Sequence, residues 1–229
     1  MNEYKFTDMK KTCIFLAFFF LGFPLFCELF GNTILVKLFP RELLVEYIDP
    51  VFYGVFFLLL VVAFRKMLVN NIKNFVKEYE RYLRLSAVFA FITLILMVVS
   101  AIVLDSVGVG ESSNQELIDE AIVKYGLLRI ITVCFWGPVV EEVFYRGILF
   151  EFFGGKKNRV IGSIIAVLLT SLLFVFWHVS IVEFSLNDLL ANIPIFMLGL
   201  SLATLRWKTD NILCSILVHI IINSIATFG

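Results

Sequence analysis

The chain has 229 residues, of which 60% are hydrophobic and 26 are phenylalanine, and its mean hydropathy is +0.95. Soluble domains of this length are closer to half apolar, and here the excess falls in long blocks, so the composition excludes a single soluble core and indicates a membrane protein. The formal net charge is +0, which gives no basis for a nucleic-acid partner.

Apolar segments long enough to cross the hydrocarbon as helices recur along the chain, and they predict an all-α, polytopic transmembrane helix bundle. About seven spans are expected, in a single membrane domain over residues 1–229. The spans are expected at residues 12–36, 47–65, 85–105, 126–150, 160–179, 188–206 and 211–228. The first span follows three lysines, as in a signal peptide, but its apolar stretch is too long and lacks a cleavage site, so we expect a retained helix.

Two segments between the spans are polar. Residues 66–84 mix apolar side chains with five lysines and arginines, which predicts a basic amphipathic stretch along the membrane surface. Residues 106–124 are polar and acidic, and we expect an exposed loop with a short helix there. Loops on the side of the amino terminus hold fourteen basic residues against four on the opposite side, which places the amino terminus in the cytoplasm. We expect the membrane to be the plasma membrane of a bacterium.

Ionisable side chains inside the spans are costly unless they are paired or hydrated, so they mark candidate functional sites. The spans contain a short set of such groups and one notable amide: Glu28, Glu141, Glu142, Arg146, His178, His219 and Asn223. The chain has two histidines, and both belong to this set. Glu28 has no evident partner and is assigned no role. The four cysteines stand alone in apolar runs, which indicates neither a zinc knuckle nor a redox pair.

Adjacent carboxylates occur in the span 126–150. Glu142 and Arg146 are four residues apart with the acid first, which favours an ion pair on one helix face. Glu141 is turned about 100° from that face, so the pair leaves one carboxylate uncompensated. Such a group can hold water and act as a general base. The alternative is a structural Glu–Arg pair beside a merely solvated Glu141.

The two histidines have different contexts. His219 and Asn223 are four residues apart and share a face of the last span. A histidine can orient water, donate to an oxyanion or bind a metal, and an asparagine amide is a donor suited to an oxyanion. His178 closes the span 160–179, where a histidine is either a catalytic candidate or an interfacial residue.

Three motifs follow one another on three of these hydrophobic segments. They are Glu141-Glu142-x-x-x-Arg146 followed by Gly147, Phe174-x-x-x-His178, and His219-x-x-x-Asn223. In this order they resemble the CPBP family, also called Abi, which includes type II CAAX prenyl endopeptidases and bacteriocin-processing proteins. The resemblance covers about residues 125–229, the expected catalytic half, whereas the helices of residues 12–105 match only as hydrophobic segments.

The resemblance implies a role for each matching residue. Glu141 would activate the attacking water with the assistance of His178. His219 and Asn223 would stabilise the oxyanion of the tetrahedral intermediate. These implied roles agree with the reading of the residues themselves, because peptide hydrolysis needs a base and donors to the developing charge.

By the same resemblance, Glu142 and Arg146 would support the site electrostatically. A metal is the open alternative, since Glu141, His178 and His219 could make a zinc site of two histidines and one glutamate. Their spacing is not that of a HExxH helix, and a water activated by glutamate needs no ion. We therefore favour a mechanism without a cofactor, with a divalent metal such as zinc as the alternative.

The depths of these residues in the membrane do not agree at first. Helical rise places Glu141 and His219 about 12–13 Å from the cytoplasmic ends of their spans, but His178 about 27 Å along its own span. A common site therefore requires that the span 160–179 begin within the cytoplasm or tilt, that the boundaries move, or that Pro138 break its helix.

The function that this pattern favours is an endopeptidase that cuts a peptide bond at or within the membrane. Its substrate is expected to be a peptide or protein in the bilayer, either a CAAX-type tail or a leader peptide. The alternative is a non-catalytic immunity or scaffold protein that binds a peptide or a partner in the same polar pocket. A proton-coupled transporter would use similar buried acids but predicts inverted repeats, which the sequence does not display.

Overall fold

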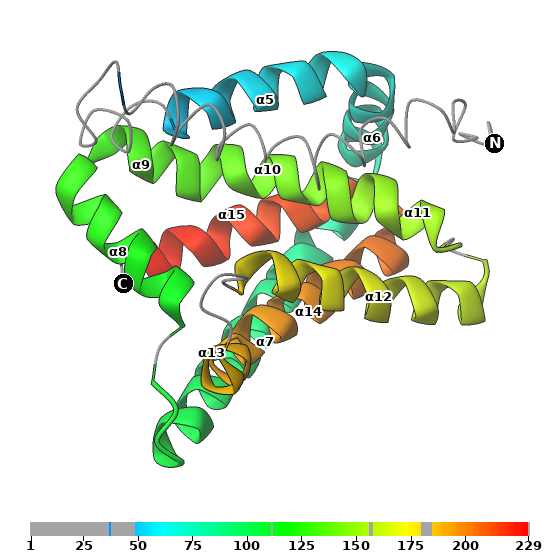
Figure 1. Cartoon of the computed structure of the whole chain (residues 1–229). Coiled ribbons are helices and arrows are strands. Elements are labelled where there is room, and N and C mark those ends of the chain that lie inside the picture. Colours follow the sequence, from blue (N-terminus) through cyan, green and yellow to red (C-terminus); the bar gives the residue numbers. More distant parts are fainter. Residues whose placement is uncertain (1–36, 38–48, 111, 156–157, 180–184, 229) are drawn as a thin grey trace.

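The computed structural model describes residues 37, 49–110, 112–155, 158–179 and 185–228. Within these residues every regular element is a helix, and the helices pack into the bundle of Figure 1. The all-α class is therefore confirmed. The expected span 12–36 and Glu28 lie outside the described residues.

Several elements follow the expected segments, but the expected span 188–206 is divided into two helices at Asn192. The first described helices are α5 (Asp49–Ala63), α6 (Arg65–Lys77) and α7 (Tyr79–Ser106), and the polar region that follows forms α8 (Ser113–Tyr125). A long uninterrupted helix is then built of α9 (Leu127–Ile131), η4 (Thr132–Trp136), α10 (Gly137–Glu142), η5 (Val143–Leu149) and α11 (Phe150–Phe152). The chain continues with α12 (Val160–His178), α13 (Leu186–Ala191), α14 (Ile193–Thr209) and α15 (Ile212–Phe228).

Two of the described helices, α7 and α12, are long and apolar enough to cross a membrane. The pair α5 and α6 makes a third candidate if the 78° bend between them is a break within one span. Large apolar side chains of α7 are exposed along its length, for example Phe91 and Ile102. Such a band is typical of a surface that faces lipid. At least two candidate spans are thus present, and the number seven stays a prediction.

The basic segment differs in extent from the prediction of residues 66–84. The helix α6 ends at Lys77, and the residues from Tyr79 onward already belong to α7. Its basic side chains are exposed, as are the apolar Ile72 and Val76. The sharp bend at Phe64 separates this helix from α5, so the charged residues do not continue the axis of the apolar helix.

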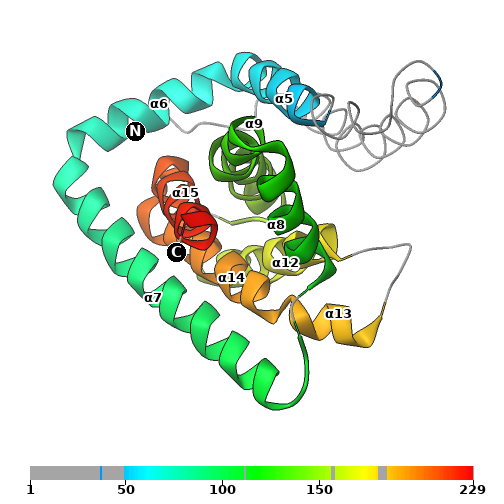
Figure 2. The same ribbon diagram turned by 90° about the vertical axis from the view of Figure 1, so that its left-hand side faces the viewer.

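The helix α15 lies in the middle of the bundle, with α6, α7, α14 and the long helix around it (Figure 2). Its start is fixed by α6, because the Asn71 side chain accepts a hydrogen bond of 2.9 Å from the Ile212 N–H. The Asn211 amide donates in return to the Asn71 carbonyl, also at 2.9 Å. These bonds set the register of the helix that carries the second histidine motif.

Close packing joins α12 to α14. A Cβ on Gly199 would lie 3.3 Å from the Cα of Ser171, so the glycine permits the two backbones to approach. The same approach exposes the Gly199 carbonyl to the long helix. Further along α14, Thr93 of α7 and Ser201 share a hydrogen bond between their hydroxyl groups. Small and hydroxylated side chains thus hold the helices around the site.

Candidate active site

The long helix changes its pitch just before the adjacent carboxylates. At η4 the Gly137 N–H donates to the Thr132 carbonyl, five residues back, as in a π-helix. The next residue, Pro138, has no N–H to donate. The Val133 carbonyl therefore loses its donor from the helix, and the side-chain amide of Asn223 bonds to it at 2.9 Å. The wider turn and Pro138 together explain why Asn223 lies against this helix.

A second π-helical stretch, η5, repeats this hydrogen-bond pattern further along the same helix. The Phe150 N–H donates to the Tyr145 carbonyl, five residues back. The neighbouring Arg146 carbonyl accepts instead from Arg206 Nε of α14, at 3.2 Å. Both irregular turns thus expose a carbonyl that a side chain of another helix satisfies, which ties the long helix to α14 and α15.

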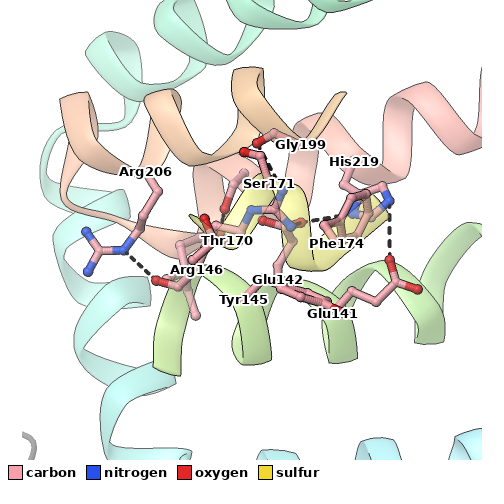
Figure 3. A network of polar contacts seen from close by, with 12 residues as sticks. Glu141, Glu142, Tyr145, Arg146, Thr170, Ser171, Phe174, Gly199, Arg206 and His219 are labelled. Atoms are coloured by element: carbon pink, nitrogen blue, oxygen red, sulfur yellow. Dashed lines mark hydrogen bonds and ion pairs between the residues drawn. The ribbon is translucent and has the colours of Figure 1, made fainter. Parts of the chain in front are cut away.

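A buried ionic network joins Glu142, between these two turns, to Arg146 of the second turn (Figure 3). Arg146 Nη1 and Glu142 Oε1 are 2.8 Å apart, and both side chains are 0% exposed. The same Glu142 oxygen lies 3.0 Å from His219 Nδ1, and Arg146 Nη2 donates to the Gly199 carbonyl at 3.1 Å. The spacing of four residues predicts the Glu–Arg pair, and the structure forms it. The contact with His219 joins helices that lie far apart in the sequence.

Phe174 fills the space between the charged groups. Its ring is fully buried, with the Arg146 guanidinium carbon 4.7 Å from the ring centroid. The rings of His178 and His219 lie 4.6 and 5.8 Å from it, centroid to centroid. The Phe174 carbonyl also accepts a hydrogen bond from His178 Nδ1 at 2.7 Å. One aromatic residue therefore positions both histidines, which explains its place in the motif.

A cavity of about 420 Å³ lies against this network. The four residues predicted to be catalytic, Glu141, His178, His219 and Asn223, all line it. Glu141 Oε2 is 3.7 Å from His219 Nε2. Glu142 and Arg146 do not line the cavity, and both are fully buried. Residues that support a site without touching the substrate are expected in such positions. His178 therefore lies in one site with the other three residues. The sequence-based depths, which assumed spans of equal height, had placed it further out.

The predicted metal ligands can be tested against this geometry. Among the described residues, no group of three His, Cys, Asp or Glu side chains is arranged to hold a metal ion. His178 and His219 each have Nδ1 hydrogen-bonded, to the Phe174 carbonyl and to Glu142. Hydrogen bonding at Nδ1 leaves Nε2 of each ring as the nitrogen that could bind a metal or a water, and the proposal below assigns these nitrogens to a water and to the oxyanion.

Two further residues of the cavity were not singled out from the sequence. Val133 binds Asn223 through its backbone, and Arg129 of α9 lines the cavity on the same helix. The signal for Val133 was Pro138 five residues later, since a proline inside a helix frees a carbonyl upstream. Arg129 had no distinctive signal, because its place near the start of a span made it one of several basic residues of a loop.

Comparison with known families gives one match. Residues 123–225 match the family described as Type II CAAX prenyl endopeptidase Rce1-like. This match confirms the resemblance that the three motifs carry and covers nearly the same residues. No curated protein and no solved structure matches the chain.

Proposed function

We propose that this chain is an intramembrane endopeptidase of the CPBP type whose attacking water is activated by Glu141, on the strength of the match of residues 123–225 to the Rce1-like family of type II CAAX prenyl endopeptidases. The observation that carries the proposal is the shared cavity. Four side chains suited to peptide hydrolysis, from three separate helices, line the same 420 Å³ space. The mechanism below assigns each of them a step.

Glu141 and His178 are assigned to the water. A carbonyl can only accept, so the hydrogen bond to Phe174 puts a proton on His178 Nδ1. In a neutral ring Nε2 then has a lone pair that can accept from the water. Glu141, for which the described residues supply no arginine partner like that of Glu142, takes a proton from this water as it adds to the peptide carbonyl carbon. When the C–N bond breaks, the proton passes to the leaving amine nitrogen.

His219 and Asn223 are assigned to the oxyanion. The Asn223 amide has two N–H groups, and the bond to Val133 uses one of them, which leaves the second for the substrate oxygen. His219 Nδ1 already donates to Glu142, so donation to the oxyanion at Nε2 requires a ring protonated on both nitrogens. Fixed donors of this kind lower the barrier because they need not reorganise during the reaction.

The substrate class follows from the family and the setting. We assign a peptide or protein segment held in the bilayer, either a CAAX-type tail or a leader peptide. From the distribution of basic residues we propose an orientation with the amino terminus in the cytoplasm, about seven spans, and a bacterial plasma membrane. In that orientation the end of the cavity lined by α8 lies on the non-cytoplasmic side.

Substitution of Glu141 tests the assignment. Glu141→Gln keeps the shape of the side chain and removes the base, and we expect the cleavage rate to fall by roughly 10²–10⁴-fold. Glu120→Gln, on the exposed face of α8, is the matched control and should keep wild-type activity. If Glu141→Gln cleaves as fast as wild type, the catalytic role is wrong. Immunity or peptide binding that persists in an inactive Glu141→Gln protein would support the non-catalytic alternative.

A further inference from the structure

The helix α6 joins two apolar helices and is itself strongly polar. Its axis turns by 78° from that of the apolar helix before it, and α7 follows it in the chain. Its 13 residues include four lysines and arginines and three asparagines, and none of them is acidic. A segment of this composition is costly to place in the hydrocarbon, so the bend and the charges together favour a position along the membrane surface.

Two different apolar faces run along α6 when its residues are placed at intervals of 100°. One face points inward, where the partly buried Met67 and Phe75 pack against the core of the bundle. The other consists of Val69, Ile72 and Val76, whose side chains are 46%, 48% and 67% exposed. This second face has no protein to cover it, as is typical of a helix whose apolar side enters the boundary between headgroups and acyl chains.

A basic stripe borders the exposed apolar face. Lys66, Lys73 and Lys77 lie within about 40° of one another and about 90° from the centre of that face. All three are exposed, and none of them forms an ion pair with a described residue. The acid that follows them, Glu78, is itself paired with Arg81 at 2.6 Å. Uncompensated ammonium groups beside an apolar stripe are complementary to anionic headgroups that lie above acyl chains.

The inward face of α6 contacts both helices that carry the ionic network. Asn71 Oδ1 accepts from the Ile212 N–H of α15 at 2.9 Å, and the Asn71 carbonyl accepts from the Asn211 amide. A Cβ on Gly147 of η5 would lie 3.1 Å from Met67 Cε, so this side chain rests directly on the long helix. A ligand that holds α6 in place therefore also holds the start of the helix that carries His219.

We propose that α6 binds anionic phospholipid, with the headgroup phosphates at Lys66, Lys73 and Lys77, and that this binding fixes the start of α15 through Asn71. Neither half depends on the proposed endopeptidase function, because both are measured without a substrate. The partner is a lipid surface rather than a soluble phosphate, since the basic stripe and the exposed apolar face lie side by side on one helix.

The first test compares two lipids that differ in headgroup charge. The full-length protein in a neutral maltoside detergent is titrated with phosphatidylglycerol or with phosphatidylcholine of the same acyl chains, and bound lipid is counted by native mass spectrometry. We expect the Kd for phosphatidylglycerol to be roughly 10- to 100-fold lower, because each lysine near an anionic surface strengthens binding about fivefold. Combined Lys66→Gln, Lys73→Gln and Lys77→Gln should lose most of this difference, and arginine at the same three positions should keep it.

A matched control removes three charges elsewhere. Lys124→Gln, Arg159→Gln and Lys208→Gln, at exposed positions outside α6, should together leave the lipid preference of wild type unchanged. The proposal is overturned by equal Kd values for the two lipids in wild type, by an unchanged preference in the α6 glutamine variant, or by an equal loss in the control. Displacement of the lipid by glycerol phosphate at the same concentration would assign the lysines to a soluble phosphate and overturn the lipid partner. If the α6 glutamine variant does not fold, the three single variants take its place, each with about a fivefold loss.

The second test follows the start of α15 by amide hydrogen exchange. With phosphatidylglycerol at ten times its Kd, exchange at Ile212 should slow about tenfold in wild type, as for a ligand that binds only the closed form. Asn71→Leu should bind the lipid as wild type does but lose this protection, since Ile212 then has no acceptor on α6. Exchange at Ile212 that is the same with and without the lipid in wild type, or protection that survives in Asn71→Leu, would overturn the link to α15.

Discussion

Removal of Arg146 is expected to destabilise the protein strongly. Its side chain and that of Glu142 are both 0% exposed, and the 2.8 Å pair is the main compensation for the buried carboxylate. Arg146→Met is close in size but leaves Glu142 with His219 as its remaining ionisable contact within the network. Loss of one partner from a buried pair costs about 3–5 kcal/mol in the free energy of unfolding, because the other charge stays buried and uncompensated.

The chain offers a matched control at the surface. Glu78 and Arg81 form a 2.6 Å pair whose side chains are 44% and 46% exposed. Arg81→Met should cost at most about 1 kcal/mol, since water solvates the charge that remains. Both variants can be unfolded reversibly in mixed detergent micelles and compared with wild type.

The double variant sharpens the comparison. Glu142→Gln with Arg146→Met removes both charges, so its cost should be well below the sum of the two single costs. The reasoning is refuted if Arg146→Met costs no more than Arg81→Met, or if the costs of the two buried substitutions simply add.

Three further predictions follow from the site. Pro138→Ala restores an N–H that can bond to the Val133 carbonyl in place of Asn223. The Asn223 amide then loses its fixed position, so kcat should fall about tenfold without a lower melting temperature. An unchanged kcat would contradict the assignment of Asn223 to the oxyanion. Gln115→Cys should react with a membrane-impermeant maleimide from outside intact cells and Lys73→Cys only after lysis; the reverse pattern inverts the proposed orientation. Activity should survive dialysis against a strong chelator, and a loss that zinc restores would favour a metalloprotease.

The sequence predicted those features that depend on local spacing. The helical period alone places Glu142 beside Arg146, and the structure forms this pair. The apolar blocks likewise predicted α12 and α15 within a few residues, because length and hydropathy determine such helices. The grouping of Glu141, His178 and His219 came from the resemblance rather than from spacing, and the structure does place all three on one cavity.

Other features depend on contacts between distant segments. The π-helical turn at η4 is stable because Asn223, ninety residues further along the chain, satisfies the exposed carbonyl of Val133. No local pattern contains that bond, so the sequence could not place Asn223 against Val133. The predicted boundary between the span 47–65 and the basic stretch 66–84 lies next to the bend at Phe64, whereas the bond that holds α6 through Asn71 to the start of α15 joins distant segments and was not predicted.

Cleavage by the purified protein tests the central claim most directly. Wild type, Glu141→Gln and Glu120→Gln are incubated in lipid nanodiscs with a farnesylated Cys-a-a-X peptide, and the products are identified by mass spectrometry. The account predicts cleavage by wild type and Glu120→Gln and a rate reduced by roughly 10²–10⁴-fold in Glu141→Gln. Equal cleavage by wild type and Glu141→Gln would contradict it.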